Sequence, residues 1–74
     1  MDAITKIIKQ VTGKPVVMES QSEDLTKMVF ARNKYTPAHV VAITDALFEI
    51  GIRTLVTRRK EAGRVSSTLI VEIV

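Results

Sequence analysis

The stretch from Thr36 to Gly51 fits one α-helix that is apolar over most of its circumference and polar on a narrow face. At about 100° per residue, one apolar stripe contains Val40, Ile43, Leu47 and Ile50. The stripe is widened on one side by Thr44, Phe48 and Val41, and on the other by Ala46. Only Ala42, Asp45 and Glu49 remain for an outward face. We therefore expect a helix that is covered on most of its surface by a sheet, with a second subunit as a further candidate for part of that cover.

Both ends of this helix are marked in the sequence. Thr36 is a suitable N-cap, because its hydroxyl can accept a hydrogen bond from a free backbone N–H of the first turn. Pro37 follows at the first helical position, where its missing N–H has no cost. Gly51 can adopt the left-handed conformation that ends a helix. These signals predict the limits of the helix independently of its apolar stripe.

A second helix is predicted near the N-terminus, from Asp2 to Gly13. Asp2 can cap it, and Gly13 followed by Lys14 and Pro15 ends it. Its single apolar stripe is formed by Ile4, Ile7, Ile8 and Val11. This spacing is typical of a helix that packs one side against a core.

Two interpretations are open for the segment between the helices. Val16 to Met18 is β-branched and follows a proline, which indicates a short strand. Leu25 to Arg32 fits a second strand, joined to the first by a turn over Gln21 to Asp24, with Met28 and Phe30 on one face. It also fits a helix that begins with a capping box of Ser20 and Glu23. We favour the strand.

A β-hairpin is predicted for the C-terminal third of the chain. Its strands run from Ile52 to Lys60 and from Val65 to Val74, and its tip is formed by 61–64, which include a glycine. On the last strand, one face carries Val65, Leu69, Val71 and Ile73, and the other carries Ser66, Thr68, Ile70, Glu72 and Val74. Such an apolar strand must lie inside the sheet or pair with another copy, because an open edge of this kind promotes aggregation.

The predicted fold class is α+β, a single domain over residues 1–74 with helices packed on a small antiparallel sheet in the order α-β-β-α-β-β. If Leu25 to Arg32 is a helix instead, the order becomes α-β-α-α-β-β. The C-terminal half then resembles the wing region of winged helix-turn-helix proteins. A recognition helix exposes a polar surface to the DNA groove. Here that surface would carry Asp45 and Glu49, which would repel phosphates.

Composition narrows the class of protein. The 74 residues include no cysteine, so the small core has no disulfide and no thiolate metal site. The N-terminal decapeptide MDAITKIIKQ lacks the uninterrupted apolar run of a signal peptide, and no apolar run is long enough for a membrane span. We expect a cytoplasmic protein that does not enter the membrane.

The net charge of +3 is concentrated in one segment. Residues 53–64 hold five basic residues and one acid, a net charge of +4, whereas the rest of the chain has a net charge of −1. A ribbon with cations at its tip can contact the phosphate backbone of nucleic acids. The candidate contacts are Arg58, Arg59, Lys60 and Arg64, with Arg53 and Lys34 as flanks. The same cations also fit a hairpin that is merely kept soluble and protected from edge pairing.

The sequence offers little for catalysis. His39 is the only histidine, and we expect it on the surface or half-buried. Asp45 and Glu49 stand one turn apart, but this spacing is also that of any solvated helix face. Gly13-Lys14 lacks the upstream glycine and the Ser or Thr of a phosphate-binding loop. We predict no enzyme activity, no catalytic residue, no metal site and no cofactor.

Two functional hypotheses follow. The first is a small regulatory protein that binds DNA or RNA through its basic hairpin, as a homodimer. The case for single-stranded RNA is weaker, because Phe30 and Tyr35 are the only candidate stacking residues. The second is a protein-interaction adaptor or inhibitor that uses an apolar strand and helix surface, where Ile70 and Val74 would contact the partner, and does not bind nucleic acid.

Overall fold

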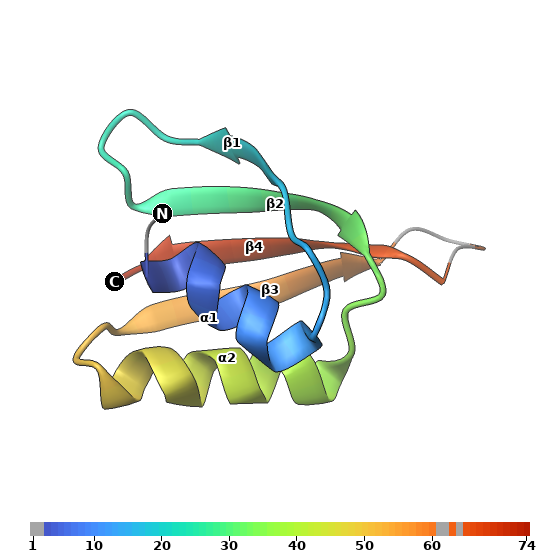
Figure 1. Ribbon diagram of the computed structural model, residues 1–74. Helices are drawn as coiled ribbons and strands as arrows, with labels where there is room; N and C mark the ends of the chain where they lie inside the picture. Colours follow the sequence, from blue (N-terminus) through green and yellow to red (C-terminus); the bar gives the residue numbers. More distant parts are fainter. Residues whose placement is uncertain (1–2, 61–62, 64) are drawn as a thin grey trace.

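Two helices and four strands make up the computed structural model, which describes residues 3–60, 63 and 65–74 (Figure 1). The elements in chain order are α1 (Ala3–Thr12), β1 (Met18–Gln21), β2 (Lys27–Asn33), α2 (Pro37–Glu49), β3 (Thr54–Lys60) and β4 (Ser67–Ile73). The order α-β-β-α-β-β and the α+β class are those predicted from the sequence. Among the described residues, no helix is long and apolar enough to cross a membrane.

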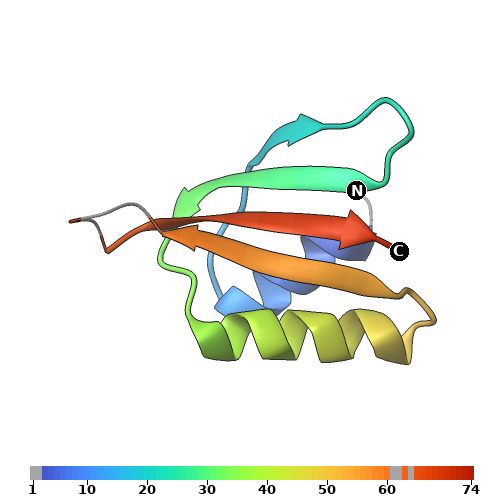
Figure 2. The same cartoon turned by 180° about the vertical axis from the view of Figure 1, so that it is seen from behind.

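The strands form one antiparallel sheet in the order β1-β2-β4-β3. Both helices lie on the same face of this sheet (Figure 1), and the view from behind shows the opposite face without a covering helix (Figure 2). β4 pairs with β2 on one side and with β3 on the other. The apolar C-terminal strand is therefore inside the sheet, which was one of the two arrangements expected for it.

The strand interpretation of the segment before α2 is confirmed. β2 covers Lys27–Asn33 and pairs with β1 and β4, so the winged helix-turn-helix alternative does not apply. Met28 and Phe30 are two positions apart, so their side chains point to the same face of the sheet, the one that packs on the helices. Both are fully or almost fully buried. A helix would have turned Phe30 away from Met28, and burial of both side chains on one face outweighs the local capping signal.

The first strand lies later in the chain than the sequence indicated. We expected it at Val16 to Met18, whereas β1 is Met18–Gln21. Val17 already accepts a backbone hydrogen bond from Ala31 at 2.8 Å, but an irregularity between Met18 and Ser20 breaks the register there. Exposed polar residues then continue the strand along the outer side of β2. An edge strand can form hydrogen bonds with its neighbour without burying its side chains. The strand propensity of these polar residues is low, so the sequence did not indicate them as a strand.

The turn between β1 and β2 is also displaced. We predicted it at Gln21 to Asp24, and it spans 22–26. Asp24 organises it: its Oδ1 accepts from Ser22 Oγ at 2.7 Å, from Thr26 Oγ1 at 2.8 Å and from Thr26 N at 3.2 Å. These bonds hold the pKa of the Asp24 carboxyl below its ordinary value, with the Ser22 bond as the largest cause.

The core lies between the sheet and the two helices. Each strand of the central pair contributes alternate residues to it, and each helix contributes the residues of one stripe. Its buried members are Ile4, Ile8, Met28, Phe30, Tyr35, Ile43, Leu47, Val56, Leu69 and Val71. The opposite face of the sheet carries a row of half-buried and polar residues across the strands, namely Ser20, Val29, Ile70 and Thr57.

α2 begins and ends where the sequence predicts. Thr36 Oγ1 accepts from the His39 N–H at 3.1 Å, and the Thr36 N–H donates to His39 Nδ1 at 3.2 Å. The two residues thus cap each other reciprocally. Gly51 has a φ of 84°, in the left-handed region that favours glycine. The lone histidine of the chain is half-buried and serves as a cap.

The cover of α2 is less complete than its apolar sequence predicts. Ile43 and Leu47 are fully buried, but Val41 and Phe48 are 60% and 62% exposed, and Ile50 is also exposed. The reason is the position of α2, which runs alongside β3 at the edge of the sheet with α1 on one side (Figures 1 and 2). The side of α2 away from α1 has no neighbour among the described residues.

Candidate nucleic-acid interface

The three consecutive basic residues of β3 lie at the end of the sheet where β3 leads into the hairpin tip. In the ladder with β4, Arg58 is opposite Leu69, Arg59 is opposite Thr68 and Lys60 is opposite Ser67. Arg58 therefore lies on the face of the sheet that packs on the helices, together with Lys60, and Arg59 lies on the uncovered face. Arg59 and Lys60 are exposed, and Arg58 is half-buried.

Lys34 reaches the same end of the sheet from a different part of the chain. It follows directly after β2, whose last residue, Asn33, is opposite Ser67 of β4. Ser67 is in turn opposite Lys60, so Asn33, Ser67 and Lys60 form one row across three strands. The Lys34 side chain is exposed, and its N–H donates to Asn33 Oδ1 at 2.8 Å. Two predicted contacts that are 26 positions apart in the sequence are thus brought to one end of the fold.

Arg58 is fixed by a hydrogen bond to the connection between β2 and α2. Its Nη1 donates to the carbonyl oxygen of Tyr35 at 3.0 Å. The hydroxyl of buried Ser67 also donates to this oxygen, at 3.4 Å. One of the Arg58 donors is therefore used within the protein. The bond to Tyr35 also keeps the positive charge of Arg58 beside Lys34.

Arg32 belongs to the same group, although the sequence did not single it out. It is exposed and lies one residue before the end of β2, beside the β4 residues that face Lys60. The missing signal was the strand order, because only the pairing of β2 with β4 brings Arg32 close to the hairpin. We call Arg32, Lys34, Arg58, Arg59 and Lys60 the basic end.

Arg53 is not part of the basic end. It precedes β3, and its carbonyl accepts from the Val74 N–H at 3.1 Å, next to the C-terminus. Arg59 follows it by six positions along the strand, a distance of about 20 Å. The remaining predicted contact, Arg64, lies outside the described residues, as does Glu61.

Most acidic residues of the described sheet and its connections lie at the end opposite to the basic end, and the exception is Glu19 of β1, which lies beside the middle of β2. Glu72, the one acid within the described ranges of β2, β3 and β4, is opposite Lys27 and Leu55. Asp24 lies in the turn that leads into the start of β2, and Glu49 is the last residue of α2. The two ends of the sheet thus differ in charge, which a total of +3 does not reveal.

α2 adds to this asymmetry. It begins at Pro37, directly after Lys34, Tyr35 and the cap Thr36, so its N-terminus is at the basic end. The aligned peptide dipoles of a helix give its N-terminus a partial positive charge and its C-terminus a partial negative charge. The helix field therefore has the same direction as the field of the charged side chains.

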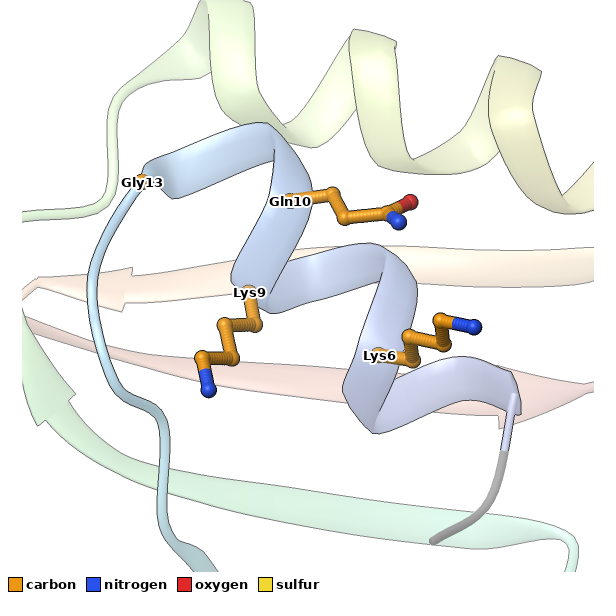
Figure 3. Close-up of a pocket in the computed structure, with 4 residues that line it drawn as sticks. All are labelled: Lys6, Lys9, Gln10 and Gly13. Atoms are coloured by element: carbon orange, nitrogen blue, oxygen red, sulfur yellow. The ribbon is translucent and has the colours of Figure 1, made fainter.

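A shallow hollow lies elsewhere, on the outer side of α1. It has a volume of about 490 Å³ and is lined by Lys6, Lys9, Gln10 and Gly13. Lys6 and Gln10 extend to one side of the helix and Lys9 to another (Figure 3). All four residues are exposed, so the hollow contains no desolvated polar group that would select a ligand.

The other candidates for chemistry remain isolated. Asp45 and Glu49 are exposed on α2. Within 3–60, 63 and 65–74, no three His, Asp or Glu side chains come together as metal ligands would. Tyr35 is buried, its hydroxyl has no hydrogen-bond partner in the described structure, and burial raises the pKa of its phenol above the ordinary 10.0.

Comparison with protein-family models, curated proteins and solved structures found no match for this chain.

Proposed function

We propose that this protein binds the phosphate backbone of nucleic acids through its basic end. The observation that carries the proposal is the convergence of Lys34 with Arg59 and Lys60 at one end of the sheet, although they belong to separate parts of the sequence. Exposed cations on a protein surface attract polyanions most strongly when they lie close together. Arg59 and Lys60 point to opposite faces of β3, so they contact phosphates on both sides of the ribbon.

The contacts are electrostatic, which determines the expected binding behaviour. Phosphate contacts carry affinity and little sequence information, so sequence preference is weak. Each phosphate neutralised on duplex DNA contributes about −0.9 to the slope of log K against log salt concentration. With four or five cations engaged, we expect a slope of about −4.

The test is a fluorescence-anisotropy titration of a labelled random-sequence duplex at several salt concentrations. The variant is Arg59→Glu combined with Lys34→Glu, and the matched control is Lys6→Glu combined with Lys9→Glu on the outer side of α1. Both variants change the net charge equally. The proposal requires a loss of about a hundredfold or more in the first variant and a much smaller loss in the control. Equal losses in both would show that only net charge matters, and no binding by the parent chain would exclude the proposal.

The second candidate function is that of a protein-interaction adaptor. It is favoured by the exposure of Val41 and Phe48 on one side of α2, each more than half accessible. Exposed apolar patches mark interaction sites when the side chains are contiguous. This function predicts that nucleic acid leaves the spectrum of the protein unchanged and that Phe48→Lys abolishes capture of the protein partner.

A further inference from the structure

The edge strand β3 has a free row of backbone hydrogen-bonding groups. In an antiparallel ladder, successive residues direct their N–H and C=O groups alternately toward and away from the paired strand. Arg53 directs its carbonyl toward Val74, and the register with β4 is unbroken from Thr54 to Lys60. The residues that point away from β4 are therefore Thr54, Val56, Arg58 and Lys60. Within the described sheet, nothing pairs with this row.

An apolar flank of α2 lies beside this free edge. Val41 and Phe48 are seven positions apart and share one side of the helix, next to the buried stripe of Ile43 and Leu47. α2 runs antiparallel to β3 alongside the edge of the sheet, with α1 on its other side (Figures 1 and 2). Since α2 is right-handed, Val41 and Phe48 lie on the side away from α1 and beyond β3. An added strand would be covered by them.

The charges along this edge are self-complementary. The second half of β3 carries Arg58, Arg59 and Lys60, and its first half carries no charge, with Arg53 as the single cation just before the strand. α2 runs in the opposite direction, and its second half, beside the uncharged half of β3, carries Asp45 and Glu49. In a twofold antiparallel pairing of two β3 strands, the basic half of each copy lies opposite the uncharged half of the other. The helix-facing cations of one copy then approach the carboxylates and the negative helix end of its partner.

We infer that two copies of this chain pair through β3, forming a continuous eight-stranded antiparallel sheet. The backbone groups of Thr54, Val56, Arg58 and Lys60 supply the hydrogen bonds, Val41 and Phe48 of each copy cover the partner's strand, and Asp45 and Glu49 meet the partner's Arg58 and Lys60. Strand addition at a sheet edge gains its affinity from main-chain bonds and its specificity from the side chains beside the edge. The antiparallel register is required, because a parallel pairing would bring like charges together.

This inference goes beyond the proposed function and does not depend on it. Arg59 faces the uncovered side of the sheet and Lys34 lies off the strand, so both remain outside the pairing surface. In the dimer, the strand ends that form the two basic ends lie on opposite sides of the sheet, because the two β3 strands run antiparallel. Arg58 and Lys60 belong to both surfaces, whereas Arg59 and Lys34 serve phosphate binding alone and Val41 and Phe48 serve the dimer alone, so variants at these four residues separate the two properties.

The first test is the molecular mass of the full chain, by sedimentation equilibrium from micromolar to millimolar concentration. The inference requires a concentration-dependent shift from 8.2 kDa to twice that mass. Hydrogen exchange monitored by NMR locates the interface: the N–H groups of Thr54, Val56 and Arg58 become protected as the dimer forms. A chain that stays monomeric at millimolar concentration, or a dimer in which these N–H groups stay unprotected, overturns the inference.

The second test uses surface variants that leave the core intact. Val41→Lys raises the dimer dissociation constant by at least about tenfold. Val17→Lys, at a position that is 65% exposed and remote from β3, leaves it unchanged. Glu49→Lys also weakens the dimer, because it places a positive charge opposite the partner's Lys60. Adding Lys60→Glu restores the dimer, because positions 49 and 60 then carry opposite charges again. Far-UV circular dichroism confirms folding of each variant. Equal effects of Val41→Lys and Val17→Lys on the dimer dissociation constant would contradict the inference. It would also be contradicted if the double variant at positions 49 and 60 failed to restore the dimer, or if the dimer formed through another surface.

Discussion

Arg58 Nη1 lies 3.0 Å from the carbonyl oxygen of Tyr35, and this hydrogen bond joins the edge strand β3 to the connection between β2 and α2. Ser67, on the strand between them, donates to the same oxygen. A basic residue that looked like a surface phosphate contact in the sequence is thus also a structural residue. The other basic residues of β3, Arg59 and Lys60, are exposed.

Arg58→Ala and Arg59→Ala should therefore separate stability from binding. A hydrogen bond from a charged donor contributes about 1.5–3 kcal/mol, so we expect Arg58→Ala to lower the free energy of unfolding by about 2 kcal/mol. Arg59→Ala should change it by less than about 0.5 kcal/mol and reduce affinity for duplex DNA. Urea unfolding and anisotropy measure the two effects. Equal stability of the two variants would show that the bond to Tyr35 contributes nothing.

Tyr35→Phe should stabilise the protein. The buried phenol hydroxyl has no hydrogen-bond partner among the described residues, and a buried donor without a partner costs about 1–3 kcal/mol. Because removal of the hydroxyl also leaves a small void, we expect a net gain of about 1 kcal/mol in the free energy of unfolding at neutral pH. Thermal unfolding monitored by circular dichroism measures this change, and a clear loss of stability would reveal a partner for the hydroxyl.

The same tyrosine predicts a transition at alkaline pH. Burial raises the pKa of the Tyr35 phenol above 10.0, so the folded protein holds this proton more tightly than the unfolded chain. The resulting stabilisation is complete below the unfolded value and is lost as the pH rises through the folded value. Unfolding curves from neutral to strongly alkaline pH should therefore show a loss of stability that Tyr35→Phe lacks. An equal loss in both proteins would assign it to other groups.

Thr36→Ala should destabilise α2. The side chain of Thr36 accepts the His39 N–H at 3.1 Å, and loss of an N-cap costs about 1 kcal/mol. Thr36→Ser keeps the oxygen and serves as the control, which should retain most of the stability. Urea unfolding of both variants tests this, and equal destabilisation would point to the methyl group rather than the cap.

Acid should loosen the turn between β1 and β2 before the core unfolds. The hydrogen bonds from Ser22 and Thr26 lower the pKa of the Asp24 carboxyl below the ordinary 3.8. A lowered folded pKa gives stabilisation that is present above the unfolded value and is lost as the pH falls through the folded value. Carboxyl carbon shifts followed by NMR should give a midpoint for Asp24 below 3.8. A midpoint at or above that value would contradict these hydrogen bonds.

The sequence predicted the elements that depend on local signals. The limits of α2 followed from Thr36, Pro37 and Gly51, and the choice of a strand for β2 followed from Met28 and Phe30 on one face. β1 was placed too early in the chain, at Val16 to Met18, because its polar residues gain their order from pairing with β2 and not from their own propensity.

The arrangement of the candidate contacts was only partly predictable. Arg59, Lys60 and Lys34 do lie at one end, but separating Arg53 from them and adding Arg32 required the strand order and register. The bond from Arg58 to Tyr35 spans 23 positions and leaves no pattern in the sequence. The exposed flank of α2 at Val41 and Phe48 also depends on where the helix lies, because its sequence alone indicates almost complete burial.

The central claim concerns phosphate binding at the basic end, and an amide NMR titration tests it most directly. The assigned protein is titrated with a short random-sequence DNA duplex at low salt, and with a single-stranded RNA of equal length as the second arm. We predict that the shifts concentrate on 32–36 and on 58–65 and disappear when salt is added, while Lys6, Lys9 and Arg53 remain unaffected. Shifts spread evenly over all basic residues, or a spectrum that stays unchanged in excess of both nucleic acids, would contradict the account.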